Sequence, residues 1–443
     1  MKHDVSKVPA EEVSKSQALY DRALGMMPGG CSRNTILRKP HPIYAAYGKG
    51  CTITDIEGVK RIDFSNTMAS LIHGHAHPKV VEAITEQARK GTAYAVGTVQ
   101  EIEYAEHLLS RNPNFERIRF ANSGTEAVMA CLKASRAYTG RPKIAKVEGA
   151  YHGLYDYAEV SQCPTPKNWG KEDHPASVPV SHGTPQAALD DVVVIPFNDP
   201  EHAVAILDEH KDDVACVLID LMPHRVGLVP IQEEFIEALE NWTRANGALL
   251  VLDEVITFRC GYGGAQEKHP IRPDLTALGK IIGGGFPVGA LAGRAEVMEV
   301  MNPLAEKVLF PHSGTFSANP ITMTAGRVSM ELYDQNAVKK LNRLAAYTRD
   351  CISPAIQVSG VPACLTGGGS MFRIQLKHEA PQNYREAFTT PTEKKATAML
   401  LDHLFDNGFI LMNTCSGALS TACLLYTSPS PRDQSLYLVC RLL

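Results

Sequence analysis

The sequence predicts an α/β fold in which a mostly parallel sheet is covered by helices on both faces. Short β-branched runs alternate with longer segments of helical periodicity through the centre of the 443-residue chain, as in parallel strands joined by crossover helices. The two ends of the chain lack this alternation. We therefore expect one large α/β domain that interrupts the two parts of a smaller α+β domain.

The strands of the large domain are expected to form a seven-stranded sheet. In chain order they are residues 117–121, 143–148, 191–197, 214–220, 248–255, 274–279 and 288–293. Residues 124–140 and 233–247 carry apolar side chains at helical spacing. Such segments are predicted to be the helices that flank the sheet.

The smaller domain is expected to come from both chain ends, around a large domain of residues 61–325. Residues 1–60 hold a helix, the loop MPGGCSRN and a hairpin with Glu-Gly in its turn. Residues 326–422 hold long helices and then strands in ACLTGGGSMFRIQL and GFILMN. Residues 159–190 lack periodicity and predict a long loop, interpreted either as a lid or binding loop or as plain disorder.

Residues 423–443 do not continue these patterns. The strings CLLYTSPSPRD and LVCRLL resemble one reading frame through a transposase-type sequencing-library adapter, with four residues between them in place of an index. A genuine polar tail is the alternative, but two matches in register and in order favour the adapter. We interpret the segment as non-native, and expect natural sequence after Ala422 to be missing.

The composition favours small-molecule chemistry. The formal net charge is −4 and the basic residues form no long run, so nucleic-acid binding is not expected. The N-terminus lacks an apolar signal core, and no stretch approaches the roughly 20 apolar residues of a membrane helix. We expect a cytoplasmic protein with free thiols, because the eleven cysteines contain no CxxC pair.

The alternating histidines His73, His75 and His77 in HGHAHP are a candidate metal site. However, no carboxylate or cysteine completes a ligand set, and histidines in turns are more often plain hydrogen-bonding residues. No metal is expected.

Two motifs directly after expected strands suggest ligand binding. ANSGTEA at residues 121–127 opens a helix, where free backbone N–H groups and the hydroxyls of Ser123 and Thr125 can bind a phosphate; an ordinary N-cap is the alternative. In EGAYHG, Tyr151 can lie flat on an aromatic ligand with His152 beside it, and core packing is the alternative.

Asp253 and Lys280 follow two further expected strands, where open α/β sheets bind their ligands. A carboxylate at that place can keep a ring nitrogen protonated. An amine removed from water has a lowered pKa and can form a Schiff base with a carbonyl. The structural alternatives are a helix cap or a pair with Arg259 for Asp253, and a solvated surface lysine for Lys280.

In this chain order, the motifs resemble the class III aminotransferases, pyridoxal-phosphate enzymes of fold type I. The resemblance runs from about Leu24 to Ala422 and includes PGG, HGHAHP, NSGTEA, YHG, LLVLDEVITFR, PDLTALGKIIGGGFPVGALAGR and HSGTFSANP. Several motifs that agree in order make a chance similarity implausible. The resemblance implies pyridoxal 5′-phosphate as the cofactor and a homodimer as the assembly.

The resemblance also implies roles for individual residues. Lys280 would hold the cofactor as an internal aldimine and move a proton between substrate and cofactor. Asp253 would keep the pyridine nitrogen protonated, and Thr315 would reach the phosphate of the neighbouring subunit across the dimer interface. The phosphate and the two ring faces would be contacted by Ser123, Gly124, Thr125, Tyr151 with His152 beside it, and Val255.

Departures from the family pattern bear on the reaction. Asp220 and Leu221 stand where relatives commonly carry Glu-Pro. Residues 154–173 replace the glycine-serine gate of glutamate-1-semialdehyde aminomutases, which favours release of a keto product. Arg33 matches an arginine that binds the substrate carboxylate in β-amino acid transaminases, with a solvated loop arginine as the alternative, and Ser416 occupies the position of their second arginine.

We therefore expect a transaminase that moves an amino group between an amino acid and a 2-keto acid, with β-amino acids as one substrate class. The alternative reaction is that of glutamate-1-semialdehyde 2,1-aminomutase. A third hypothesis is a folded pyridoxal-phosphate-binding protein that is inactive because its C-terminus is altered.

Overall fold

A seven-stranded sheet forms the centre of the computed structural model, which describes residues 14–426. Its strands are β4 (Arg117–Ala121), β5 (Lys143–Val147), β6 (Val192–Ile195), β7 (Val214–Ile219), β8 (Leu249–Asp253), β9 (Leu275–Gly279) and β10 (Gly289–Gly293). Their order across the sheet is β4-β10-β9-β8-β7-β5-β6. Only β10 is antiparallel to its neighbours. This confirms the α/β class and the mostly parallel sheet.

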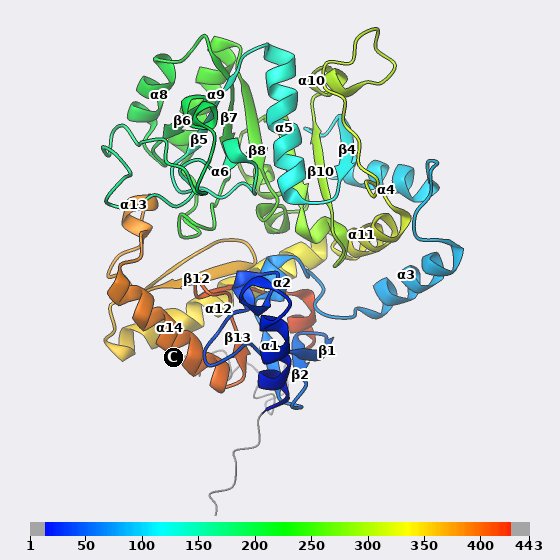
Figure 1. The fold of residues 1–443 in the computed structure, drawn as a ribbon, viewed down its shortest axis with the longest axis vertical. Helices are drawn as coiled ribbons and strands as arrows, with labels where there is room; N and C mark the ends of the chain where they lie inside the picture. Colours follow the sequence, from blue (N-terminus) through cyan, green and yellow to red (C-terminus); the bar gives the residue numbers. More distant parts are fainter. Residues whose placement is uncertain (1–13, 427–443) are drawn as a thin grey trace, which may run out of the picture.

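Helices cover both faces of this sheet (Figure 1). The helix α5 (Gly124–Thr139) packs on one face, and α8 (Pro200–Asp208) and α9 (Glu233–Asn246) pack on the other. The other helices are α1 (Lys15–Leu24), α2 (Asn66–Ala69), α3 (Pro78–Lys90), α4 (Val99–Leu109), α6 (Asp156–Glu159), α7 (Gln186–Asp190), α10 (Ala295–Met298), α11 (Pro320–Leu332), α12 (Gln335–Ser359), α13 (Tyr384–Ala387) and α14 (Pro391–Asp406).

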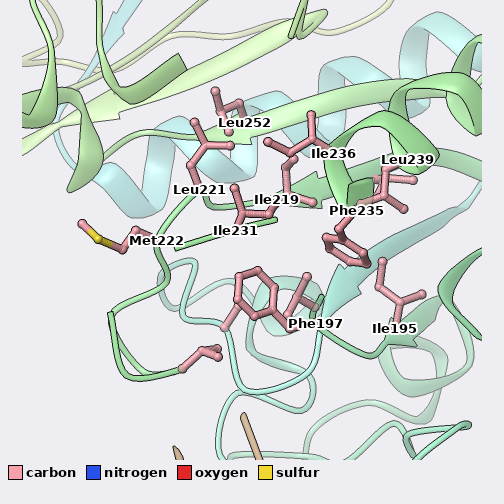
Figure 2. Close-up of a cluster of buried hydrophobic side chains, with 14 of the residues drawn as sticks. Ile195, Phe197, Ile219, Leu221, Met222, Ile231, Phe235, Ile236, Leu239 and Leu252 are labelled. Carbon is pink, nitrogen blue, oxygen red and sulfur yellow. The ribbon is translucent and has the colours of Figure 1, made fainter. Parts of the chain in front are cut away.

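Successive residues of each strand enter two different cores, because side chains alternate between the faces of a sheet. In β8, Leu250 and Leu252 pack with Phe235 of α9, whereas Leu249 and Val251 pack on the side of α5. Figure 2 shows the first of these cores, with side chains from α9 next to those of β7 and β8. Burial on both faces explains why the strands are continuous apolar runs.

Two smaller sheets lie outside the central one, and the first of them joins the N-terminal and C-terminal parts of the chain. One has the order β1-β2-β3-β13, and the other β11-β12-β14. The strand β13 is parallel to β3, so a segment near residue 410 completes a sheet that starts near residue 45. The strand bounds are β1 (Ala45–Lys49), β2 (Thr52–Asp55), β3 (Lys60–Asp63), β11 (Cys364–Thr366), β12 (Met371–Gln375), β13 (Phe409–Ile410) and β14 (Ser416–Ala418).

Several local predictions are also confirmed. The turn between β2 and β3 contains Glu57 and Gly58, and Gly58 has a φ of 88°. Most of residues 159–190 is loop, as expected, but residues 186–190 form the short helix α7. The domain boundaries stay a prediction, and the boundary after residue 325 falls inside α11.

Residues 421–426 continue the described chain as a 3-10 helix, and residues 427–443, most of the expected adapter segment, lie outside the described residues. Among the helices of residues 14–426, none combines the length and apolar character needed to cross a membrane.

Candidate active site

The candidate site lies at the edge of the central sheet where its parallel strands end. Because β10 runs the other way, it begins at this edge, with Gly289 opposite both Gly279 and Ala121. The segments that follow β4, β5, β7, β8 and β9 are therefore brought together. They contain Ser123, Tyr151, Asp220, Asp253 and Lys280.

The first turn of α5 forms one wall of the site. The Ser123 hydroxyl caps this helix by accepting the N–H of Glu126 at 3.1 Å. Gly124 lies so close to Val255 that a Cβ on Gly124 would be 2.7 Å from its Cγ1. The first N–H groups of a helix have no acceptor within the helix, so those of Gly124 and Thr125 are available to an anion.

Asp253 is a buried carboxylate held by two hydrogen bonds. Its Oδ2 lies 2.8 Å from Nδ1 of His152, and its Oδ1 accepts the N–H of Val255 at 2.9 Å. The other ring nitrogen of His152, Nε2, is buried without a hydrogen-bond partner among the described residues. Burial lowers the pKa of His152, against the effect of the neighbouring carboxylate. Asp253 does not pair with Arg259, the structural alternative left open by the sequence.

Lys280 directly follows β9 with a φ of 48°, in the left-handed region that glycine favours. Burial lowers the pKa of its amine, and the charges of Asp253 and Asp220 oppose that effect. Burial, followed by the charge of Asp253, raises the pKa of Asp220 well above its usual range. Both carboxylates therefore act on the Lys280 amine, with Asp253 as the larger influence.

The loop after β5 brings Tyr151 to the same place. A Cβ on Gly153 would lie 2.7 Å from Oγ1 of Thr125, so this loop packs against the first turn of α5. The ring of Tyr151 is 37% exposed, and the guanidinium carbon of Arg225 lies 5.4 Å from its centroid. The structure thus gathers all but two of the site residues expected from the sequence.

Thr315 and Arg33 lie outside this cluster. Thr315 is exposed in the loop before α11, where Oγ of Ser317 lies 3.5 Å from Nδ2 of Asn122. Arg33 is exposed and lines a separate cavity of about 730 Å³, which Lys280 and Asp253 do not line.

Inspection of the sequence missed His224, Arg373 and Thr414, of which the last two line that cavity. His224 follows β7, and its Nε2 lies 3.3 Å from Oγ1 of Thr414, while its carbonyl accepts Nη1 of Arg373 at 3.0 Å. Burial, and then the charges of Arg373 and Lys280, lowers the pKa of His224 to about 3. Arg373 had one visible signal, since it is a charged residue inside the apolar run MFRIQL.

Two of the three histidines of HGHAHP bond to protein groups, whereas Nδ1 of His77 is buried without a hydrogen-bond partner among the described residues. His73 bonds through Nε2 to the carbonyl of Ser329 at 2.8 Å and through Nδ1 to Thr421 at 2.7 Å. Nε2 of His75 lies 2.8 Å from the Asp63 carboxylate. The motif HGHAHP does not indicate this carboxylate, because Asp63 belongs to β3.

Comparison with known proteins identifies the family. The model of the family described as aminotransferase class-III matches residues 37–431. The chain belongs to the class III aminotransferases. This confirms the resemblance seen in the sequence and the expectation of an enzyme, and pyridoxal phosphate, the cofactor of these aminotransferases, is confirmed with it.

Relatives of this aminotransferase carry names from two reactions. The glutamate-1-semialdehyde 2,1-aminomutase of Methanothermobacter thermautotrophicus is 39% identical over 379 residues, which are 85% of this chain and 87% of the relative. The omega-transaminase of Sphaerobacter thermophilus is 42% identical, covers 98% of each chain and has a TM-score of 0.93. A β-phenylalanine aminotransferase from Variovorax paradoxus is 30% identical over 96% and 92% of the two chains, with a TM-score of 0.84.

Proposed function

We propose that this aminotransferase is a transaminase that moves an amino group from an amino acid, β-amino acids included, to a 2-keto acid. The observation that carries the proposal is the anchoring of residues 165–175, within the segment that follows Tyr151. An aminomutase has to keep its intermediate behind a closing loop, whereas a transaminase has to release a keto product. A segment fixed to the body of the protein favours release.

One arginine of α13 provides this anchoring. Arg385 donates from Nη2 to the carbonyls of Trp169 and Lys171 at 2.8 and 2.7 Å. Its Nε lies 2.9 Å from the Glu148 carboxylate at the end of β5. The guanidinium also lies 4.9 Å from the ring centroid of Trp169. Charge-assisted bonds of this kind hold a loop more firmly than neutral ones.

The residues at the sheet edge fit pyridoxal phosphate, which supplies, when bound, an aldehyde that condenses with amines and a ring that withdraws electrons. The free N–H groups at the start of α5 suit the phosphate, with Ser123, Gly124 and Thr125 as its ligands. The buried carboxylate of Asp253 suits a protonated ring nitrogen. His152 holds that carboxylate in place through its 2.8 Å bond.

Lys280 is the residue to which we assign proton transfer. Its lowered pKa makes the amine neutral more often than an ordinary lysine, so it can accept a proton from the substrate carbon. Tyr151 would cover one face of the cofactor ring, and Val255, which packs against Gly124 and Gly279, would cover the other.

We also propose a homodimer in which Thr315 serves the site of the partner subunit. Large apolar side chains are strongly exposed in the single chain, among them Val96 at 74%, Leu304 at 91% and Phe316 at 59%. Exposed apolar surface of this kind marks an interaction site. Light scattering should give twice the mass of one chain, and a monomeric mass would contradict the proposal.

The two candidate reactions differ in their need for a second substrate. The cofactor-loaded protein should form glutamate from 2-oxoglutarate and a β-amino acid, and Lys280→Ala should not. Glutamate-1-semialdehyde should not be converted without a keto acid. Its conversion to 5-aminolevulinate in that assay would replace the proposal by the aminomutase reaction, which the 39% identity to that enzyme favours.

A further inference from the structure

Arg373 lies in the middle of β12, on the strand face turned toward the central sheet. Side chains of residues two apart share one face of a strand, so Arg373 lies on the same face as Gln375. Gln375 donates to the carbonyl of Gly227 at 3.2 Å, and Arg373 donates to that of His224 at 3.0 Å. This face of β12 therefore contacts the segment that leaves β7 at the edge of the candidate site.

Within residues 14–426, the guanidinium of Arg373 is a buried cation without an anionic partner. The residue is only 7% exposed, and its Nε has no hydrogen-bond partner among the described residues. The one hydrogen bond that its guanidinium makes within residues 14–426 goes from Nη1 to the neutral carbonyl of His224. Burial lowers its pKa only to about 10, so it is charged at neutral pH. A buried charge is stabilised by pairing, which indicates that an anion belongs beside Arg373.

In the part of the chain that the structure describes, the cavity beside Arg373 also lacks a free carboxylate that could fill this role. Arg373 lines the cavity of about 730 Å³, together with Arg33 and Thr414. Six Lys or Arg and three Asp or Glu line this cavity. Each of the three acids is already paired, in the couples Asp63–His75, Asp402–Arg38 and Glu393–Lys377. The cavity therefore presents excess positive charge to whatever enters it.

Polar groups next to Arg373 can complete an anion site. Ser416 lies directly opposite Arg373 in the antiparallel pair of β12 and β14, so the two side chains share one face. The Ser416 hydroxyl lies 2.9 Å from that of Thr414, which is 3.3 Å from Nε2 of His224. Arg373 and Thr414 line the cavity, and His224 lies on the segment that leaves β7 at the edge of the candidate site, so this group joins the cavity to that edge.

We infer that Arg373, with Thr414 beside it, binds the carboxylate of the substrate while the substrate amine reaches Lys280. The identity of the ligand as an amino acid or a keto acid rests on the proposed function. The planar guanidinium fork suits a carboxylate. An amine that lacks the carboxylate gains nothing from this subsite, so Arg373 makes the enzyme prefer amino acids over simple amines.

A matched pair of substrates isolates this contribution. 3-Amino-3-phenylpropanoate and 1-phenylethylamine differ only by the carboxylate, and the absorbance of the bound cofactor follows the first half-reaction without any keto acid. Arg373→Met should raise the half-saturating concentration of the amino acid by about 30-fold and leave that of the amine within about twofold. Arg38→Met, in the same cavity but paired with Asp402, should change neither. Arg373→Lys, which keeps the charge, should retain part of the preference and serves if the methionine variant does not fold.

Calorimetry with 3-phenylpropanoate, which has no amine to react, tests the subsite apart from the reaction. The wild type and Arg38→Met should bind 3-phenylpropanoate, and Arg373→Met should not. This result would support the subsite even if no amine is transaminated. In that case only the proposed function would fail. Equal weakening of both substrates, or unchanged binding of 3-phenylpropanoate by the Arg373 variants, would overturn the inference and leave the transaminase proposal standing.

Discussion

His224 shows how the fold changes the ionisation of a single residue. Burial, followed by the charges of Arg373 and Lys280, lowers the pKa of its imidazole from 6.5 to about 3. A positive charge on a buried ring near these cations would be costly. His224 is therefore a neutral hydrogen-bonding group beside the candidate site at physiological pH.

We expect acid to destabilise the protein through His224. Between pH 6.5 and about pH 3, the unfolded chain binds a proton that the folded chain excludes, so the free energy of unfolding decreases as the pH falls through this window. The loss attributable to this residue is at most about 3 kcal/mol at pH 4. Urea denaturation at pH 7 and pH 4.5 should show a smaller loss for His224→Gln than for the wild type. The control is His202→Gln, at an exposed imidazole paired with Asp199. This variant should not show the smaller loss expected for His224→Gln.

Replacing Lys280 should abolish the first half-reaction. Without the amine, no group at this position can take the proton from the substrate carbon, and we expect the rate to fall by roughly 10³-fold or more. Stopped-flow absorbance of the cofactor-loaded Lys280→Ala variant provides the measurement. Lys268→Ala, at an exposed position 12 residues earlier, is the control, and near-normal rates in Lys280→Ala would exclude the proposed role.

The site residues that sequence inspection found are those that directly follow strands. Asp253 and Lys280 could be placed together because the carboxyl ends of parallel strands meet at one edge. Arg373 could not be placed at the site from the sequence, because its position depends on the register between β12 and β14. In that register Arg373 lies opposite Ser416. Ser416 stood out in the sequence as the position of a missing arginine, whereas an arginine on the neighbouring strand becomes visible only in three dimensions.

Among the elements, the turn α2 has an unusual backbone. Its four residues Asn66–Ala69 have φ values of 45°, 52°, 56° and 67°, which form a left-handed turn. Asp63 accepts the N–H of Asn66 at 3.0 Å, and the Asn66 side chain donates to the carbonyl of Ala418 at 2.6 Å. These bonds hold a conformation that L residues otherwise avoid. The sequence SNTMAS carries no glycine that would have predicted it.

Substitutions in this turn should separate the effect of backbone strain from that of the hydrogen bond to Ala418. Asn66→Ala removes the bond to Ala418 and should lower the free energy of unfolding by about 1–3 kcal/mol. Thr67→Gly should be neutral or stabilising by up to about 1 kcal/mol, because glycine adopts left-handed dihedrals without strain. Urea denaturation of both variants tests this. A Thr67→Gly variant that is less stable than Asn66→Ala would contradict it.

The segment that Arg385 anchors illustrates what can be predicted about a loop. The lack of periodicity in residues 159–190 correctly indicated irregular structure, but its anchor comes from α13, more than 200 residues later. Arg385→Ala should leave the Glu148 carboxylate buried and unpaired, at a cost of about 3–5 kcal/mol. Amide hydrogen exchange should then accelerate in residues 165–175 and not in the central strands. Unchanged exchange there would show that other contacts hold the segment.

At the scale of the whole molecule, Arg259 connects parts of the chain that are far apart in sequence. It is fully buried, and it donates to the Ser370 hydroxyl at 2.8 Å, to the carbonyl of Ala69 at 2.9 Å and to the carbonyl of Leu419. One side chain thus joins α2 and the segments around β12 and β14 to the end of β8. The sequence predicted the strands around β8 and β12, but neither the turn α2 nor the residue that connects these parts.

Removing this connection should weaken the whole protein. Arg259→Met leaves two carbonyls and a hydroxyl without their donor, and we expect the free energy of unfolding to fall by about 2–5 kcal/mol. Arg117→Met, at an exposed position in β4, is the control and should stay within about 0.5 kcal/mol of the wild type. Thermal denaturation of the two variants provides the comparison, and equal melting temperatures would contradict the connecting role of Arg259.

The parallel pairing of β3 with β13 has a consequence for biosynthesis. When residues 60–63 leave the ribosome, the segment that will cover their edge, residues 409–410, has not been made. At roughly 5–20 residues per second, this edge waits for about 20–70 s. During that time the central sheet can form, while the uncovered N-terminal strands are exposed to premature association. A nascent-chain chaperone that shields these strands would therefore raise the yield of the native enzyme.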